Sequence, residues 1–121
     1  MTATANKNLG NHGEYIATDY LNRHGYKIVE RNCRLGRREI DIIANQNDKR
    51  IFIEVKTRVK TTDSIYENPL SKQQIHNLKL AIIDYCRKNR FPLETVRLDL
   101  IIILIDQNQK TAALKHYRDI F

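Results

Sequence analysis

The stretch that decides the fold is Arg50-Ile-Phe-Ile-Glu-Val-Lys56, together with Glu39-Ile-Asp-Ile-Ile-Ala44 shortly before it. Both runs are rich in β-branched residues, which favour strands, and the tract Asn45-Gln-Asn-Asp-Lys49 between them favours a turn. The pattern therefore predicts a β-hairpin over residues 39–56. Charged residues interrupt both apolar runs, and a charge in a buried strand is costly unless something specific satisfies it.

Two acidic side chains of this hairpin are predicted to stand side by side. A register with Ile43 opposite Phe52 leaves a turn of suitable length. The same register sets Asp41 opposite Glu54, and regular alternation places Asp41 on the same face as Ile43. Adjacent carboxylates repel each other, and a divalent cation that prefers hard oxygen ligands, Mg²⁺ or Mn²⁺, removes the conflict.

Lys56 lies two residues beyond Glu54 on the same face of the strand. There it can neutralise a phosphate oxygen or hold a metal-bound water in its hydroxide form. Asp41 and Glu54 are therefore the expected metal ligands, and Lys56 is a third catalytic candidate. A structural interpretation stays open, with Asp41 paired to an arginine and Glu54–Lys56 forming a surface ion pair worth less than about 1 kcal/mol.

The charge of the chain favours a polyanionic partner. The 121 residues carry 21 Lys and Arg against 14 Asp and Glu, for a net charge of +7. Between Arg23 and Lys60 there are 11 basic residues and five acidic ones. Nucleic acid is the commonest partner of such a surface, although a solvated surface that only keeps the protein soluble is the simpler alternative.

Several other classes of protein do not fit the composition. No apolar run approaches the roughly 20 residues needed to cross a bilayer, so no membrane partner is expected. Residues 1–10 lack the apolar block of a signal peptide. Cys33 and Cys86 are too few for a disulfide framework. The predicted compartment is the cytoplasm.

The whole pattern predicts an α/β fold in which a mixed β-sheet is flanked by helices. Helices are expected over 11–24 and 71–90, further strands over 26–29, 96–105 and 112–116, and an irregular loop over 61–69. Gly25 is placed to end the first helix and Ser71 to cap the second. The nearly continuous apolar run 96–105 predicts a central strand that is parallel to a neighbour. Residues 1–10 are expected to be a flexible segment and residues 11–121 a single domain.

These residues resemble the PD-(D/E)xK motif of restriction-endonuclease-like nucleases, with Ile40-Asp41 as its first half and Glu54-Val55-Lys56 as the ExK. From about Gly10 to Phe121 the chain is also similar to the YraN-like family of small bacterial proteins. The matching stretches are Gly13-Glu14 with Ala17, Tyr20 and Leu21; Gly25-Tyr26; Glu30-Arg31-Asn32; Glu39-Ile-Asp-Ile-Ile43; Phe52-Ile-Glu-Val-Lys-Thr-Arg58; Lys72-Gln73; and Arg97-Leu-Asp-Leu100. The resemblance implies a restriction-endonuclease-like sandwich and a metal-dependent nuclease site that hydrolyses phosphodiester bonds.

The resemblance also implies that Glu14 reaches toward this site from the first helix as a fourth catalytic residue. Asn11-x-x-Glu14 fits a capping box equally well, in which Glu14 bonds back to the start of the helix. Asp99 and Arg97 share a face of the apolar strand, and an internal ion pair explains both. His116 and the other histidines show no metal-ligand spacing.

Six basic residues are the expected nucleic-acid contacts: Arg34, Arg37, Arg38, Arg58, Lys60 and Lys72. For Arg58 and Lys72 an ordinary solvated surface position is the alternative. So short a chain leaves little room for a separate recognition domain, so structured or damaged DNA is expected ahead of RNA. Homodimerisation would let two sites cut both strands. The alternative function is a non-catalytic nucleic-acid-binding module that acts through protein partners.

Overall fold

The computed structural model describes residues 3–60 and 70–121, with side chains from residue 12 onward. Its helices and strands follow the predicted order, and they confirm a mixed sheet flanked by helices. They are α1 (Ala3–Arg23), β1 (Lys27–Leu35), β2 (Arg38–Gln46), β3 (Lys49–Val59), α2 (Lys72–Asn89), the 3-10 turn η1 (Leu93–Thr95), β4 (Val96–Asp106) and β5 (Thr111–Tyr117). The predicted loop 61–69 lies outside the described residues.

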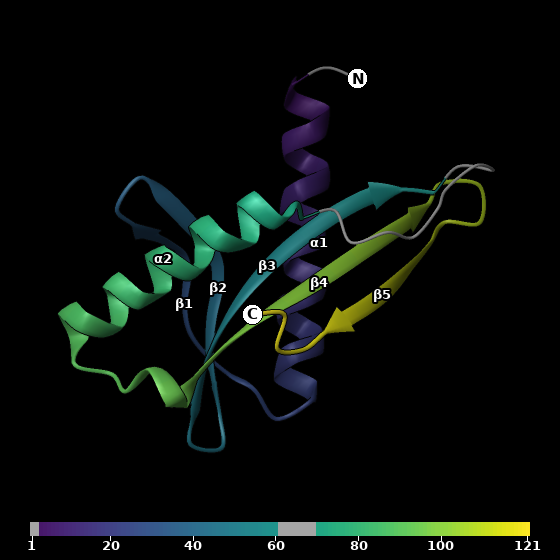
Figure 1. The fold of residues 1–121 in the computed structure, drawn as a ribbon. Helices are drawn as coiled ribbons and strands as arrows, with labels where there is room; N and C mark the ends of the chain where they lie inside the picture. Colours follow the sequence, from purple (N-terminus) through teal and green to yellow (C-terminus); the bar gives the residue numbers. More distant parts are fainter. Residues whose placement is uncertain (1–2, 61–69) are drawn as a thin grey trace.

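The five strands lie in the sheet in the order β1-β2-β3-β4-β5, so each strand pairs with its neighbour in the chain (Figure 1). The pairs β1–β2, β2–β3 and β4–β5 are antiparallel, whereas β3–β4 is parallel. A parallel pair needs a crossover connection, and α2 lies in the connection between β3 and β4. The predicted central parallel strand is therefore confirmed.

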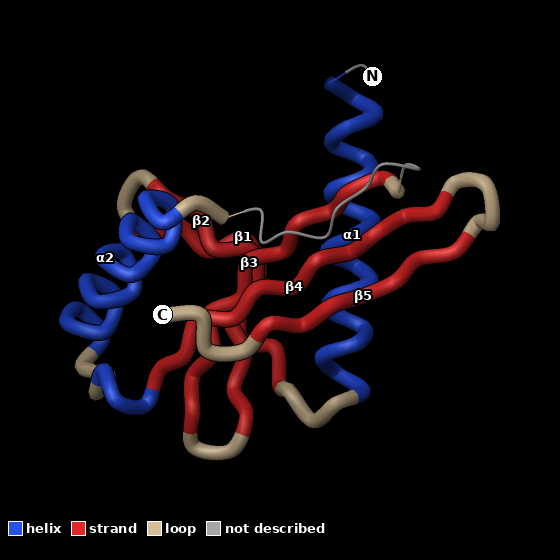
Figure 2. Tube along the Cα trace, turned by 45° about the vertical axis from the view of Figure 1, so that its right-hand side comes forward, coloured by secondary structure: helices blue, strands red, loops and turns tan. Residues whose placement is uncertain are grey.

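The two helices cover opposite faces of the sheet (Figure 2). On the α2 side, Phe52 and Leu98 of the sheet pack with Ile82 of the helix in one apolar core. On the α1 side, Leu21 packs with Ile53 and other sheet residues in a second core. Each helix thus buries one apolar stripe, as expected for a three-layer α/β sandwich.

Helix α1 begins at Ala3 rather than at Asn11, so the predicted boundary is wrong. Its buried stripe includes Ala17 and Leu21, while the N-terminal turns extend past the sheet (Figure 1). The apolar pattern shows where a helix packs on the sheet and does not fix where the first turns of that helix begin. Whether the first turns are flexible stays a prediction. Gly25 follows the helix end at φ 83°, which is the left-handed conformation expected of it.

Helix α2 has the predicted cap. The Ser71 hydroxyl accepts a hydrogen bond from the Gln74 N–H at 3.1 Å, and the Gln74 side chain accepts one from the Ser71 N–H at 2.8 Å. This reciprocal capping box fixes the N-terminus of the helix. The helix ends at Arg90 in the left-handed conformation, and Pro92 follows it.

The central hairpin has the predicted register at its turn end, with Ile43 opposite Phe52. Pairing between β2 and β3 runs only as far as Ile42 opposite Ile53. The predicted ladder pair of Asp41 with Glu54 is absent from this register. Beyond Ile42, the described part of β2 pairs with β1 alone.

The alternation of side chains along β2 reverses at Asp41, which the sequence pattern does not predict. Ile40 and Ile43 both lie in the α2-side core, whereas Ile42 lies in the α1-side core. On the neighbouring strand, Asn32 has a φ of 52°, a conformation that asparagine tolerates better than most residues. The irregularity therefore involves both β1 and β2, and the Asp41 side chain does not follow the regular alternation of β2.

Candidate active site

The Asp41 carboxylate occupies the point where β2 and β3 stop pairing. Its Oδ2 accepts a hydrogen bond from the Val55 N–H at 2.8 Å, so a side chain replaces a backbone acceptor of the ladder. Val55 stands between Glu54 and Lys56 in the chain. This bond therefore holds Asp41 next to the Glu54-Val55-Lys56 segment, although by a different contact from the predicted cross-strand pair.

Glu54 is a buried carboxyl whose negative charge is only partly compensated, by Lys56 and by the Asp41 N–H. It is 8% exposed, and its Oε1 has no hydrogen-bond partner among the described residues. Burial and the charge of Asp41 raise its pKa to about 7, against the opposing charge of Lys56. Buried polar atoms in native proteins are almost always paired, so this oxygen points to a partner outside the chain.

Glu14 reaches the same place from α1. The helix continues past Asn11 to Ala3, so the capping-box interpretation of Glu14 is wrong. The carboxyls of Glu14 and Asp41 lie close enough to share a hydrogen bond, and Arg31 Nη2 lies 3.9 Å from Glu14 Oε2. Burial and the charge of Asp41 raise the pKa of Glu14, and burial raises the pKa of Asp41 despite the Val55 N–H and Lys56.

Gly13 allows α1 to approach β3 this closely. A Cβ at position 13 would lie 1.8 Å from Thr57 Oγ1 and 3.0 Å from Thr57 Cβ. No side chain fits this contact unless the helix moves away from the strand or Thr57 changes its rotamer. Glu14 is the next residue, so the same contact sets how far its carboxyl reaches toward Asp41.

Gly13→Ala is therefore expected to destabilise the protein by about 1–3 kcal/mol, because the helix has to shift or Thr57 has to rotate. Chemical denaturation measures the change. Thr57→Ala removes the closest atom, so the double variant should recover part of the loss that the single Gly13→Ala variant shows. Equal losses in both backgrounds would contradict the close contact.

Glu54 and Lys56 face an open hollow of about 760 Å³ between the sheet and α2. Arg37, Arg38 and Glu39, at the start of β2, line the same hollow. Two of the six predicted nucleic-acid contacts, Arg37 and Arg38, thus lie beside the predicted catalytic residues.

The other four basic candidates lie elsewhere. Arg34 lines a separate pocket of about 190 Å³, and Arg58 donates to the Thr57 carbonyl at 2.9 Å. Lys60 pairs with Asp106 at 3.8 Å, and Lys72 is exposed in the first turn of α2. The structure does not bring these four to the hollow.

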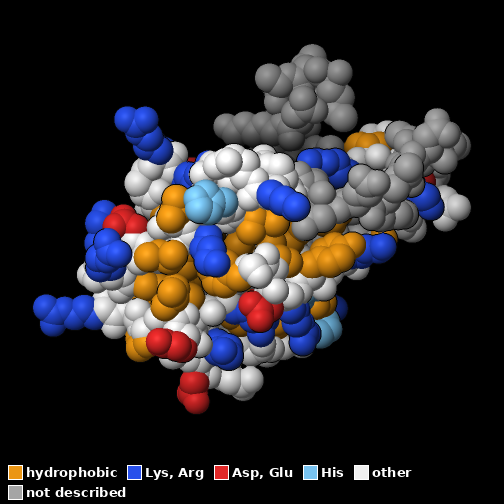
Figure 3. All heavy atoms as spheres, viewed as in Figure 1, with side chains coloured by type: hydrophobic (Ala, Val, Ile, Leu, Met, Phe, Trp, Pro, Cys, Tyr) orange, Lys and Arg blue, Asp and Glu red, His pale blue; other side chains and the backbone are white. Residues whose placement is uncertain are grey.

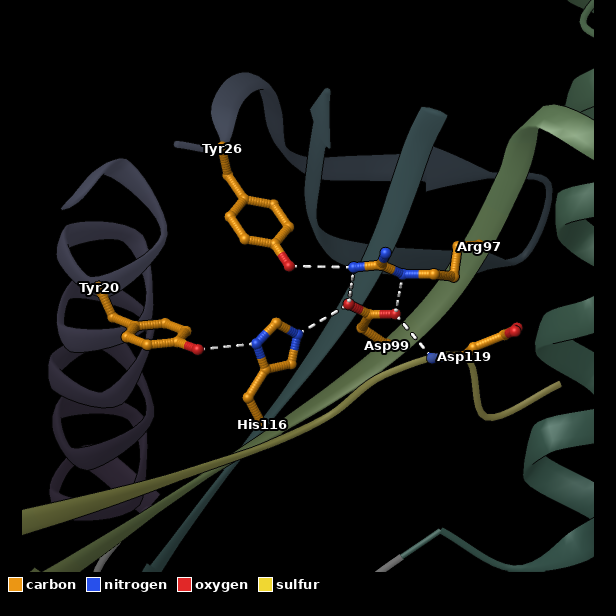
Figure 4. Close-up of polar contacts among 6 residues, drawn as sticks. All are labelled: Tyr20, Tyr26, Arg97, Asp99, His116 and Asp119. Atoms are coloured by element: carbon orange, nitrogen blue, oxygen red, sulfur yellow. Dashed lines mark hydrogen bonds and ion pairs between the residues drawn. The ribbon is translucent and has the colours of Figure 1, made fainter. Parts of the chain in front are cut away.

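A buried polar network on the α1 side of the sheet was only partly visible in the sequence (Figure 4). Asp99 is fully buried and accepts two hydrogen bonds from Arg97, each 2.8 Å long, as the predicted ion pair. It also contacts His116 Nε2 at 2.7 Å and the Asp119 N–H at 2.9 Å. Burial alone would raise the pKa of Asp99, but the bonds from His116 and Arg97 outweigh it and hold the pKa below its usual value.

The outer members of this network are two tyrosines. Tyr20 OH lies 2.9 Å from His116 Nδ1, and Tyr26 OH accepts from Arg97 Nη2 at 3.0 Å. The signal in the sequence was the pair Arg97 and Asp99 inside an apolar strand, and it does not show that His116 and the two tyrosines complete the network. The network joins α1, β4, β5 and the C-terminal segment, and it lies apart from Glu54 and Lys56.

The fold and the site together define a small α/β protein with a carboxylate and lysine site on its central hairpin. The family model described as "Uncharacterised protein family UPF0102" matches residues 13–103, and the chain belongs to this family. A UPF0102 protein of Syntrophomonas wolfei is 35% identical over 86% of this chain and 90% of its own length. One from Chlorobium phaeobacteroides is 38% identical over 93% of this chain and 92% of its own length.

Among solved structures, Pyrococcus furiosus SfsA in complex with Ca²⁺ is similar to this chain with a TM-score of 0.40 and 14% identity. The match covers 88% of this chain and 60% of that chain. Likeness at this level supports no conclusion about the site. Within the described residues, no helix is long and apolar enough to cross a membrane.

Proposed function

We propose that this protein is a metal-dependent nuclease of the PD-(D/E)xK type, with a restriction-endonuclease-like fold, which hydrolyses phosphodiester bonds of nucleic acid. The observation that carries the proposal is the unpartnered, buried Oε1 of Glu54 beside Asp41, with Lys56 facing the same hollow. Structured or damaged DNA is the proposed substrate, ahead of RNA.

The residues of the site fit Mg²⁺ or Mn²⁺. Among the described side chains, no three carboxylate, histidine or cysteine groups converge closely enough to form a complete metal cage. Mg²⁺ does not need such a cage, because it commonly binds through one or two carboxylates and completes its shell with water and substrate phosphate. Asp41 and Glu54 would hold the cation, and Glu14 would assist from outside through its contact with Asp41.

Each residue of the site then has a separate task. The cation would polarise the scissile phosphate and lower the pKa of an attacking water. Lys56 places a positive charge next to Glu54, where it stabilises negative charge that develops on the phosphate. The Val55 N–H fixes the orientation of Asp41, and Arg37 and Arg38 bind the neighbouring phosphates.

The test is a cleavage assay with purified protein and labelled single-stranded, duplex, flap and four-way-junction DNA. Mg²⁺, Mn²⁺ or EDTA is added in parallel, and Asp41→Asn is included as the ligand variant. Metal-dependent cutting that Asp41→Asn lacks supports the nuclease. Salt-sensitive binding without any cutting would favour the non-catalytic binding module in its place.

Metal-free protein is expected to lose stability as the pH rises from about 4.5 toward about 7. Glu54 has a raised pKa of about 7 in the folded protein, so the folded state keeps a proton that the unfolded chain has already released. The stabilisation that this proton provides is complete below the pKa of Glu54 in the unfolded chain. It disappears as the pH rises past the pKa of Glu54 in the folded protein. Thermal unfolding in EDTA at several pH values measures this slope.

The cation should reverse that loss, because it binds the ionised carboxylates and competes with protons. Mn²⁺ should therefore raise the unfolding temperature more at about pH 8 than at about pH 5.5. Glu54→Gln should flatten the slope seen in EDTA. The same slope in wild type and Glu54→Gln would assign the effect to another group.

We further propose that the protein works in the cytoplasm, because both cysteines are free and buried, which suits a reducing compartment. Homodimerisation stays a prediction.

A further inference from the structure

We propose that the hollow beside Glu54 and Lys56 receives an unpaired nucleotide, with its base against α2 and its phosphate toward the sheet. The inference deepens the proposed nuclease function and rests on it, because the phosphate would be the one presented to the catalytic residues. It narrows the substrate class to single strands, flaps and frayed ends.

The size of the hollow fits this ligand. Its volume of about 760 Å³ lies within the range of pockets that enclose small ligands the size of one or two nucleotides. The hollow has two walls. One is formed by Arg37 and Arg38 at the start of β2, and the other by one side of α2. A phosphodiester that reaches Glu54 has to enter between these walls.

Charge alone gives the hollow little attraction for a polyanion. The basic residues that line it are Arg37, Arg38 and Lys56, and the acidic ones are Glu39, Glu54 and Asp84. With Glu54 ionised, the three charges of each sign cancel in the absence of a cation. A regular duplex presents its phosphates outward and keeps its bases stacked inside. Without metal it can therefore make few favourable contacts with the hollow.

The α2 wall offers contacts that only an unstacked base can use. Leu80 is 53% exposed and lines the hollow with Ala81, next to the amide side chains of Gln74 and Asn77. Apolar side chains bind the face of an extruded base, and amides can bond its edge. On this side of the molecule, hydrophobic side chains lie exposed with Lys and Arg around them (Figure 3). The wall therefore favours an unpaired nucleotide over a duplex.

The experiment measures binding without cleavage. Wild-type protein in EDTA is titrated into a labelled single strand and into the blunt duplex of the same sequence, and fluorescence anisotropy gives both dissociation constants. Leu80→Ser is compared with Leu93→Ser, a matched change of a leucine that is 45% exposed and is not among the residues that line the hollow.

We expect wild type to bind the single strand about tenfold more tightly than the duplex, a difference that one or two base contacts supply. Leu80→Ser should lose most of that preference, while Leu93→Ser should keep it. Equal or tighter binding of the duplex, or equal effects of the two variants, would overturn the inference.

The two proposals fail in different ways. A single-strand preference that depends on Leu80, with no cleavage in any metal, would contradict the proposed nuclease activity and support the nucleotide site. Metal-dependent cleavage without that preference would support the proposed nuclease activity and contradict the nucleotide site. The absence of metal-dependent cleavage together with the absence of salt-sensitive binding to either ligand would contradict both proposals.

Discussion

Glu54→Gln is expected to abolish metal-dependent cleavage and, in the same protein, to raise the stability of the metal-free fold. Loss of the charged ligand should lower the cleavage rate by at least about 10³-fold, since removal of one preorganised charged or hydrogen-bonding group already costs about 10²–10³-fold. Glutamine keeps the shape of the side chain. The core around Phe52 and Leu100 should therefore remain packed.

The gain in stability follows from the burial of a charge that Lys56 and the Asp41 N–H compensate only in part. At pH 8 the folded protein holds an ionised Glu54 whose pKa is raised to about 7 by burial and by Asp41. Removing that charge should stabilise the metal-free protein by about 1–3 kcal/mol at this pH, and the glutamine amide can donate to the Asp41 carboxylate. Most substitutions at buried positions destabilise a protein. A gain in stability would therefore distinguish Glu54 from an ordinary buried residue.

Glu94→Gln is the matched control, because Glu94 is exposed in η1 and far along the chain from the site. It should change neither cleavage nor stability. Cleavage assays and denaturation curves in EDTA provide both measurements. A Glu54→Gln protein that cuts at the wild-type rate, or that unfolds more easily than wild type at pH 8, would mean that Glu54 is an ordinary structural carboxylate.

Asp99→Ala is expected to give the largest loss of stability in the molecule, about 3–5 kcal/mol. The substitution leaves the guanidinium of Arg97 largely buried without its carboxylate, and breaking a buried pair from one side costs about this much. It also removes the acceptor for His116 and for the Asp119 N–H. Urea denaturation at pH 7 measures the change.

Tyr20→Phe is the milder control, because it removes one hydrogen bond to His116 and should cost only about 1 kcal/mol. The pKa of Asp99 is lowered in the folded protein, so its contribution is present above the unfolded value and disappears in acid. Asp99→Ala should therefore differ least from wild type at the lowest pH. An equal loss of stability in Asp99→Ala and Tyr20→Phe would mean that the bonds of Asp99 together contribute no more than the one bond of Tyr20.

The regular strands of the fold and their pairing near the hairpin turn were predictable from the sequence. The apolar run 96–105 gave a parallel central strand, and the turn between the β-branched runs gave the register of Ile43 with Phe52. The reversal at Asp41 was not predictable, because it coincides with an irregularity in a different strand, where Asn32 has a positive φ. Strand periodicity assumes a regular pleat, and the site is built where the pleat is irregular.

The candidate site was found because its residues lie close together in sequence on one hairpin. The hairpin pattern predicted that Asp41 lies near Glu54 and Lys56, although by a ladder pair that is absent from the structure, and Glu14 needed the resemblance. The hydrogen bond between Tyr20 and His116 joins residues 96 positions apart, and no local pattern connects them. Net charge does not show which surface each basic side chain occupies, so the sequence could not separate Arg37 and Arg38, which line the hollow, from the other four basic candidates.

The strand order leaves β1 at one edge of the sheet, with its outer backbone groups unpaired by any described strand. Lys27, Arg31 and Arg34 stand along this edge against the one acidic residue Glu30. Two copies that met edge to edge through β1 would bring these like charges together, which disfavours strand-to-strand aggregation. Arg34, which does not reach the hollow, belongs to this row of charges and adds to the repulsion between copies at this edge.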